Sequence, residues 1–283
     1  MIRQILLHLP TYPDRAPLQG LESAAFLTQQ LGASLTAQIT QLSDDPSTWP
    51  PVIGTFPLDF PQMMGEAVAI SRANADALAK DVTDTCAIFS VTADMRRGLT
   101  TLLGSPDALV DLGRLHDLTV LPFPALDTFG RDIMNAAIFG SGRPTLLLPS
   151  SQRARPLRKL NKVMVAWDYS REAARAMADA VPILTQAKEV HILSVFGEKG
   201  LRTSCVPADL EKYLATHKIK YELDQTTLKN GTIGECLLSH AAGINADMLV
   251  MGAYGHSRWR EFVQGGATKT ILSEALLPVF VSH

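Results

Sequence analysis

The feature that most constrains the fold of this chain is an internal repeat, in which two halves carry the same succession of segments. Gln4–Pro10 near the start and Lys162–Asp168 near the midpoint are both apolar runs of strand length. Each leads into a segment with helical periodicity, Leu18–Leu31 in the first half and Arg171–Gln186 in the second. This recurrence predicts two structural units of the same kind.

The ends of the two halves also match. His116–Pro122 parallels Ala246–Gly252, and Arg143–Leu148 parallels Leu277–Ser282. A stretch rich in Ser, Arg and Pro separates the halves and has the composition of a linker. The expected organisation is a first domain over residues 1–150, a linker over 151–159 and a second domain over 160–283.

Short apolar runs alternate with helical patterns throughout the second half. The expected strands are Val163–Ala166, Val190–Val195, Ile219–Leu223, Met248–Met251 and Val279–Val281. The expected helices lie around 171–186, 207–217, 232–243 and 266–276. The alternation predicts an α/β fold in which each half forms a doubly wound, mostly parallel, five-stranded sheet. The first half follows this scheme less clearly, with a long irregular insertion expected over Asp44–Pro61.

Residue types that suit a nucleotide gather where strands of the second half end, which is where ligands bind in open α/β sheets. Asp168 follows the first strand. Its carboxylate could accept hydrogen bonds from a ribose hydroxyl or an adenine amine, or it could cap the following helix. Gly252 and Gly255 follow the fourth strand and would let the backbone approach a ligand closely, although an ordinary turn has the same pattern.

A second pair of glycines, Gly265 and Gly266, opens the last expected helix. Backbone N–H groups at a helix start suit phosphate, and a plain helix N-cap would look the same. The conjunction G-x2-G-x9-G, between an apolar strand and a closing helix–strand unit, is more specific than either pair. It resembles the signature of ATP-binding universal stress proteins, and the resemblance runs through 160–283. The first half looks like a diverged copy, so the whole resembles a tandem universal stress protein with Rossmann-like, adenine nucleotide α-hydrolase-like domains.

The resemblance implies a role for each matching position. The implied nucleotide-binding residues are Asp168, Val195, Met251, Gly252, Gly255, Gly265, Gly266, Ala267 and Thr268. Asp168 would face the ribose or adenine, and Val195 would contact the base. Met251, Gly252 and Gly255 would line the adenosine and first phosphates. The outer phosphates would be held by Gly265, Gly266, Ala267 and Thr268. The family usually has Ser or Thr directly after its last motif glycine, where this chain has Gly266. One hydroxyl donor is therefore missing, at a cost of about 1 kcal/mol of binding.

The first half lacks the corresponding chemistry. Pro10 stands where Asp168 stands, and Pro122 stands where Gly252 stands. Proline removes a backbone donor and the freedom to turn with positive φ. Gly140–Gly142 is a remnant of the glycine pattern in the wrong context. We expect no nucleotide in the first half by the same mode of binding.

Composition and the remaining polar residues narrow the function classes. A formal net charge of -2 argues against a nucleic-acid partner, and no apolar run reaches the length that spans a membrane. The histidines show no metal-ligand spacing, so no metal site is expected in the protein itself. His256, Arg258 and Arg260 could reach phosphates or could be solvated loop residues. The cysteines are odd in number and widely spaced in the sequence, which predicts free thiols in a reducing cytoplasm.

These observations favour a cytoplasmic, stress-response, ATP-binding regulatory protein with the nucleotide, and Mg²⁺ beside its phosphates, in the C-terminal domain. No residue is placed to activate water, so ATP hydrolysis should be slow at most. An alternative is a universal stress protein scaffold that has lost ATP binding and binds another small ligand or a partner protein. An enzyme of the α-hydrolase group is less favoured, because nothing supplies its catalytic residues.

The last strands of the two halves suggest how the halves assemble. In the family such strands commonly pair across a dimer. Here Thr145–Leu148 and Val279–Val281 could pair within one chain. The expectation is an internal pseudo-dimer that could form a homodimer in turn, and that acts on a regulatory protein partner of unknown identity.

Overall fold

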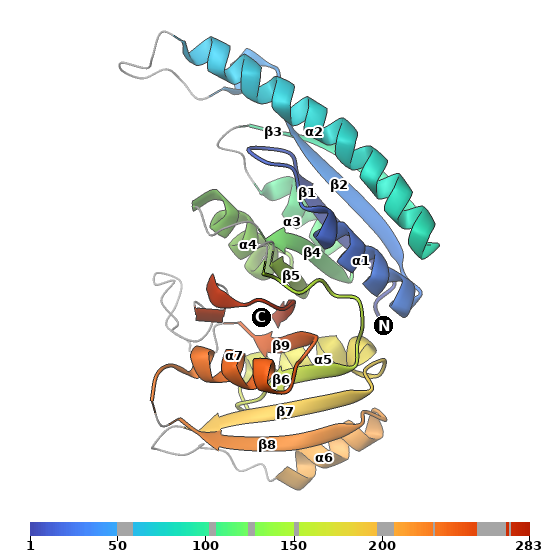
Figure 1. Ribbon diagram of the computed structural model, residues 1–283, viewed down its shortest axis with the longest axis vertical. Coiled ribbons are helices and arrows are strands. Elements are labelled where there is room, and N and C mark those ends of the chain that lie inside the picture. The colour runs from blue at the N-terminus through green and yellow to red at the C-terminus, as the bar shows by residue number, and fades with distance from the viewer. Residues whose placement is uncertain are drawn as a thin grey trace.

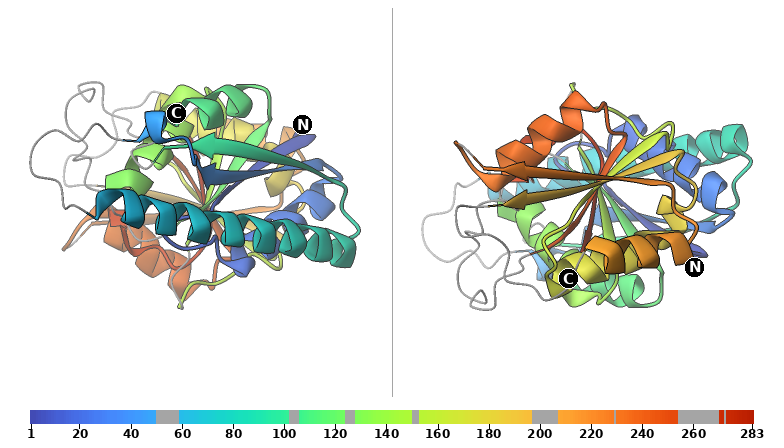
Figure 2. Two further views of the ribbon diagram at one scale, coloured as in Figure 1. Left: turned by 90° about the horizontal axis from the view of Figure 1, so that it is seen from above. Right: turned by 90° about the horizontal axis from the view of Figure 1, so that it is seen from below.

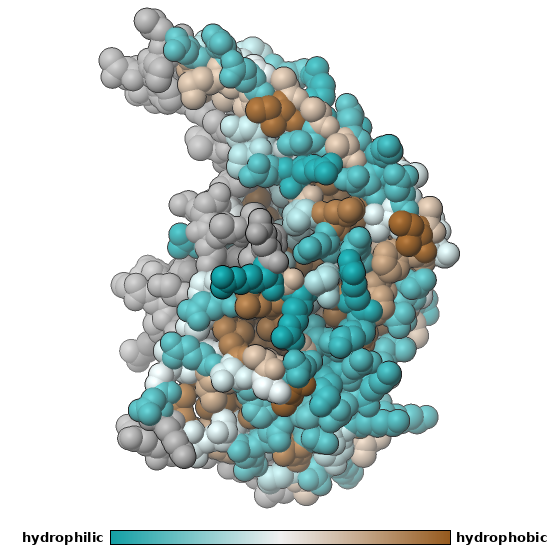
Figure 3. Space-filling view, in the orientation of Figure 1, coloured by the Kyte–Doolittle hydropathy of each residue, from teal (hydrophilic) through white to brown (hydrophobic). Residues whose placement is uncertain are grey.

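The computed structural model describes residues 1–49, 59–101, 106–123, 128–149, 153–196, 207–228, 230–253, 270–271 and 273–283. Within these ranges no helix is both long enough and apolar enough to cross a membrane. Most of the face seen in Figure 3 is hydrophilic, with apolar side chains scattered over it.

Strands and helices alternate in the first half as the repeat predicts. Its elements are β1 (Gln4–Pro10), α1 (Leu18–Leu31), β2 (Ser34–Leu42), the short 3-10 helix η1 (Pro46–Thr48), α2 (Phe60–Phe89), β3 (Ala93–Thr100), α3 (Asp107–Arg114), β4 (Leu118–Phe123), α4 (Thr128–Gly140) and β5 (Thr145–Pro149). All neighbouring strands of this half are parallel, in the order β3-β2-β1-β4-β5.

The second half repeats the arrangement. Its elements are β6 (Lys162–Ala166), α5 (Arg171–Leu184), β7 (Glu189–Phe196), α6 (Pro207–Thr216), β8 (Tyr221–Thr227), α7 (Ile233–Gly243), β9 (Met248–Gly252) and β10 (Val279–Ser282). Residues 270–271 and 273–274 are helical, which fits the helix expected around 266–276. These strands are also parallel, in the order β10-β9-β6-β7-β8, so each half is the doubly wound sheet that the sequence predicts.

The two sheets join at their last strands into one ten-stranded sheet, ordered β3-β2-β1-β4-β5-β10-β9-β6-β7-β8 (Figure 1). β5 and β10 are antiparallel, with Phe280 opposite Leu146 and Val281 opposite Thr145. The expected pairing of these strands within one chain is therefore confirmed. The strands fan around the long axis of the molecule when it is viewed end-on (Figure 2), as the twist of a long sheet requires.

Helices cover both faces of the sheet, and the two large hydrophobic cores each run through both halves. On one face, apolar residues of α1, α2, α5 and α6 pack against side chains such as Ile5, Val163 and Phe280. On the other face, α3, α4 and α7 pack against alternate residues such as Leu6 and Met164. Alternation of side chains along each strand produces these two layers.

The chain between β5 and β6 is packed where the structure describes it. Leu157 is 1% exposed in the core beneath α1, and its backbone N–H donates to Ser23 Oγ over 3.0 Å. Arg158 pairs with Glu22 of α1 over 2.7 Å. These contacts attach the segment that precedes β6 to the first half.

Two elements differ from the sequence-based expectation. α2 is a 30-residue helix that begins at Phe60, inside the expected irregular insertion. η1 also lies in that insertion, and residues 50–58 are outside the described ranges. β8 covers Tyr221–Thr227 instead of Ile219–Leu223, because Ile219 caps the end of α6 with a backbone hydrogen bond to Leu214.

Candidate functional site

β6 lies at the topological switch point of the second sheet, where the strand order changes direction. It pairs with β7 on one side and β9 on the other, although β7 follows it directly and β9 comes much later. Parallel sheets bind ligands outside the carboxyl ends of strands at such a point. In Figure 1 these ends lie on the left of the molecule, on the same side as the carboxyl ends of β1, β2 and β3.

Asp168 lies two residues beyond β6 and is exposed at this edge. Its Oδ1 accepts the backbone N–H of Ser170 over 2.9 Å. Ser170, and not Asp168, is the N-cap of α5, since its Oγ accepts the backbone N–H of Ala173 over 3.1 Å. Asp168 therefore braces the turn before the helix with one oxygen. Its Oδ2 has no partner among the described residues.

Val195 and Met251 flank this position from neighbouring strands. Ala166, the last residue of β6, pairs with Leu193 of β7, and Asp168 and Val195 each lie two residues further along the chain. Val195 is half-buried and packs on the α7 side of the sheet. Met251 is buried on that side, beside Val281 of β10. The structure thus brings three of the expected nucleotide-binding residues to one edge of the sheet.

Gly252 ends β9 against the first turn of α5. A Cβ at this position would lie 2.4 Å from the carbonyl carbon of Glu172 and 2.6 Å from the backbone nitrogen of Ala173. Real side chains do not approach backbone so closely, so only glycine fits here. From the sequence, Gly252 is expected to let the backbone approach a ligand. In the structure, the element that lies against it is α5 of the same chain, so that expectation is incomplete.

A carboxylate already occupies the first turn of α5. Glu172 is buried, and its Oε1 accepts two hydrogen bonds from Arg171, over 2.7 and 3.1 Å. Burial pushes the pKa of Glu172 up, but a backbone hydrogen bond and Arg171 outweigh it and leave the pKa below its ordinary value. The positive end of α5 thus faces an ionised side chain of its own, which makes this terminus a poor phosphate site.

Tyr169 lies at this edge of the sheet, and no pattern in the sequence predicts its unusual backbone conformation. It has a φ of 60°, in the left-handed region that non-glycine residues rarely adopt. Its ring meets that of Trp167 edge-to-face, with centroids 5.4 Å apart. Side chains held in such backbone conformations cluster at functional sites, and here the strained residue adjoins Asp168.

Several expected residues of the site fall outside the described ranges. These are Gly255, Gly265, Gly266, Ala267 and Thr268, together with His256, Arg258 and Arg260.

A group of side chains of the types that bind metals lies elsewhere, at the amino-terminal ends of β7 and β8. Glu189, His191 and Glu222 place one ligand atom each within 4.8 Å of one another. Their partners are already protein groups, since Lys162 lies 3.5 Å from Glu189 and Asp224 lies 3.2 Å from His191 Nδ1. His191 Nε2 lies 2.9 Å from Glu189 Oε1 without the alignment of a hydrogen bond. We assign no metal to this group.

The matching edge of the first half is built differently. Pro122 lies against Gly20 of α1, where a Cβ would come within 2.9 Å of the proline ring. Pro10, in the place of Asp168, borders a cavity of about 180 Å³.

Comparison with known proteins agrees with this architecture. Residues 159–283 match the family model described as the universal stress protein family. No curated protein matches the chain.

Solved structures resemble the chain over nearly its whole length. A universal stress protein from Archaeoglobus fulgidus DSM 4304 superposes with a TM-score of 0.67 and 16% identity, covering 98% of this chain and 95% of that one. A functionally unknown protein from Pseudomonas aeruginosa PAO1 gives a TM-score of 0.61 and 15% identity, with coverage of 99% and 92%. At these identities the likeness concerns the fold. The segment 159–283 is therefore a universal stress protein domain, within a chain whose α/β fold is that of a solved universal stress protein.

Proposed function

We propose that the carboxyl edge of β6 and β9 binds an adenine nucleotide, with ATP as the expected ligand and Mg²⁺ beside its phosphates. The observation that carries the proposal is the position of Asp168, exposed at the point where the strand order diverges, with one carboxylate oxygen unpartnered among the described residues. That oxygen suits a ribose hydroxyl or an adenine amine as donor. Membership of 159–283 in the universal stress protein family supports the same ligand.

Each expected residue has a role in this proposal. Val195 contacts the base, and Met251 and Gly252 with Gly255 line the adenosine and first phosphates. Backbone N–H groups of Gly265, Gly266 and Ala267, with the Thr268 hydroxyl, hold the outer phosphates. Asp168 is assigned to the ribose or adenine, and Glu172 in the first turn of α5 is engaged by Arg171, so neither is free to activate water and hydrolysis is at most slow. Nucleotide occupancy then regulates a partner protein in the cytoplasm during stress by favouring one conformation or assembly of the chain, a homodimer included.

Titration calorimetry with ATP tests the role of Asp168. Asp168→Asn keeps an amide oxygen for the Ser170 N–H and replaces the unpartnered oxygen by an NH₂ group, so the turn is retained. We expect at least a tenfold loss of ATP affinity, because a ligand donor would then face another donor. The matched control is Asp84→Asn on the exposed face of α2, which should bind like the wild type.

Two outcomes contradict the proposal. Equal ATP affinity of Asp168→Asn and wild type would remove Asp168 from the site. No heat with ATP, ADP or AMP in any variant would favour the alternative of a scaffold that has lost nucleotide binding.

A further inference from the structure

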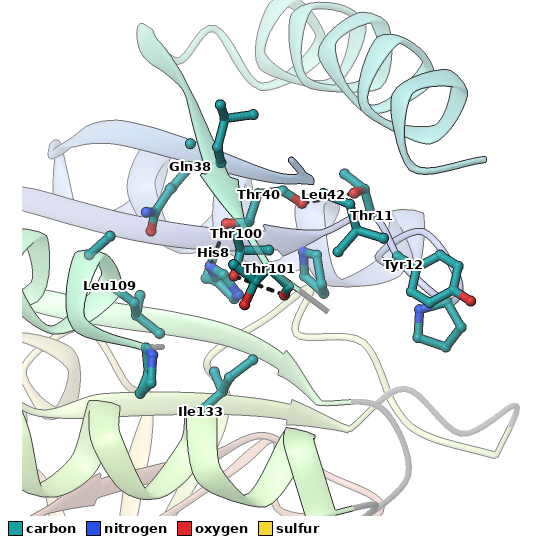
Figure 4. Close-up of a pocket in the computed structure, with 16 residues that line it drawn as sticks. His8, Thr11, Tyr12, Gln38, Thr40, Leu42, Thr100, Thr101, Leu109 and Ile133 are labelled. Atoms are coloured by element: carbon teal, nitrogen blue, oxygen red, sulfur yellow. Dashed lines mark hydrogen bonds between the residues drawn. The ribbon is translucent and has the colours of Figure 1, made fainter. Parts of the chain in front are cut away.

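The carboxyl edge of the first half contains a partly open cavity whose lining does not suit a nucleotide. It has a volume of about 180 Å³ and lies beneath the ends of β1, β2 and β3. Figure 4 shows Gln38 and Thr40 of β2 on one side of it and Leu109 of α3 and Ile133 of α4 on the other. A cavity of about 150 Å³ accommodates benzene, so this one has room for one or two rings.

Two polar residues of β2, Gln38 and Thr40, line this cavity, and Gln38 is buried there. Leu35, Ala37 and Ile39 point into the core beneath α1 and α2, and the alternate residues face the opposite side. Such alternation usually marks a sheet face open to water. Gln38, however, is 4% exposed, and its Oε1 has no hydrogen-bond partner among the described residues. Because buried acceptors are nearly always satisfied, this oxygen marks the place of a missing donor.

The neighbouring polar groups are neutral and already engaged with one another. The Gln38 side chain lies beside His8, and His8 Nδ1 lies 3.4 Å from Thr40 Oγ1. Burial lowers the pKa of His8 to about 4, so the ring is uncharged at neutral pH. The described residues that line the cavity include no Asp, Glu, Lys or Arg. A phosphate or a carboxylate would find no counter-charge there, and burying it would be costly.

We propose that this cavity, which we call the β2 pocket, binds a compact neutral molecule of one or two rings that carries an N–H or O–H donor for Gln38 Oε1. Leu109 and Ile133 form an apolar wall that holds the rings, and Gln38 selects the donor. The site is separate from the nucleotide edge of β6 and β9, so it does not depend on ATP binding.

Matched ligand pairs test the donor requirement on the full chain. Indole and indene have nearly the same shape, but only indole has an N–H; phenol and toluene differ in the same way by an O–H. Saturation-transfer NMR and calorimetry should show indole or phenol binding at least tenfold more tightly than its donor-free counterpart. Asp168→Asn should leave these affinities unchanged.

Three variants locate the binding. Gln38→Leu keeps the volume and removes the acceptor, so the preference for the donor should fall to about one while the donor-free ligand still binds. Thr100→Val retains the shape of the same wall and Gln38, and should keep the preference. Gly98→Val adds side chain beside Gln38, where a Cβ would lie 3.7 Å from Nε2, and should abolish binding of both ligands.

Equal affinity for indole and indene in the wild type would overturn the proposal, as would a donor preference that survives in Gln38→Leu. Absence of binding of all four ligands to a wild-type protein that unfolds cooperatively would overturn it too.

Discussion

The two halves of the sheet solve one packing problem in opposite ways. Where β9 ends beside the start of α5, the strand supplies the glycine, Gly252, and the helix supplies its backbone. Where β4 passes the start of α1, the helix supplies the glycine, Gly20, and the strand supplies the bulk of Pro122. Both solutions bring a helix onto the sheet at the same place in the repeat. The fold therefore fixes that contact but does not decide which element provides the space.

The same contrast extends to chemistry at the strand ends. The second half ends β6 in an exposed carboxylate, Asp168, whereas the first half ends β1 in Pro10 and encloses neutral polar groups. The two halves have the same strand order, but the second has an exposed carboxylate at its carboxyl edge and the first has a partly open cavity whose described lining carries no Asp, Glu, Lys or Arg. Both binding proposals therefore rest on a few residues at the ends of the strands.

The largest effect should come from the residue that joins the halves. Phe280 is fully buried in β10, opposite Leu146 of β5. Phe280→Ala should lower the free energy of unfolding by about 4 kcal/mol, as is usual for buried aromatic residues. Chemical denaturation followed by fluorescence and by circular dichroism should still show one transition, because both cores cross the junction. Phe139→Ala on α4, where the side chain is 43% exposed, is the control and should cost much less. Two separate transitions in the wild type would show that the halves are independent.

Acid should destabilise the first half through His8. Its pKa is about 4 in the folded protein and about 6.5 when unfolded, so unfolding takes up a proton between these values. The stabilisation by the neutral ring is complete above pH 6.5 and is lost as the pH falls toward 4, by about 3 kcal/mol. The stability difference between wild type and His8→Gln should change by that amount between pH 7 and 4. A pH-independent difference for His8→Gln would mean that the ring is hydrated.

Gly252→Ala tests the packing of the second half. The new Cβ would overlap the backbone of Glu172 and Ala173, and relief requires β9 or α5 to shift. We expect a loss of about 2 kcal/mol in unfolding free energy, typical of overpacking. Gly243→Ala at the end of α7, where nothing lies within 4 Å of the new Cβ, is the matched control. If both variants unfold alike, the close approach of β9 and α5 is not tight.

Gly20→Ala should have the smallest effect. Its Cβ would press on the Pro122 ring at 2.9 Å, but alanine also favours the helical backbone of α1 by about 1 kcal/mol. The two contributions nearly cancel, so the net loss should stay below about 1 kcal/mol by thermal and chemical unfolding. Gly20→Ala costing more than Gly252→Ala would reverse the comparison between the halves.

The sequence predicts the architecture better than it predicts the sites. The repeat, the strands of the second half except β8, and the pairing of Thr145–Leu148 with Val279–Val281 follow from local patterns. The helical pattern of α2 is weak in the sequence because many of its buried side chains, such as those of Ala67, Ser71 and Ala75, are small. β8 was misplaced because its residues alternate with polar side chains, as expected for a strand at the sheet edge.

Long-range contacts explain the rest. Gly252 is glycine because of a helix that begins 80 residues earlier, at Arg171–Ala173, which no local motif reveals. The β2 pocket combines residues from three strands, two helices and the loops between them, and neither His8 nor Gln38 on its own indicates a binding site in the sequence. Asp168 was identified from its place after β6, although the identity of its ligand stays a prediction.

The antiparallel contact of β5 with β10 has a consequence for how the halves communicate. Two separate copies joined by such strands would come apart on dilution, and any signal between them would vary with the amount of protein in the cell. Here the contact is made within a single polypeptide, so its occupancy is independent of concentration. A ligand that binds in either half is therefore always connected to the other half through the same ten-stranded sheet.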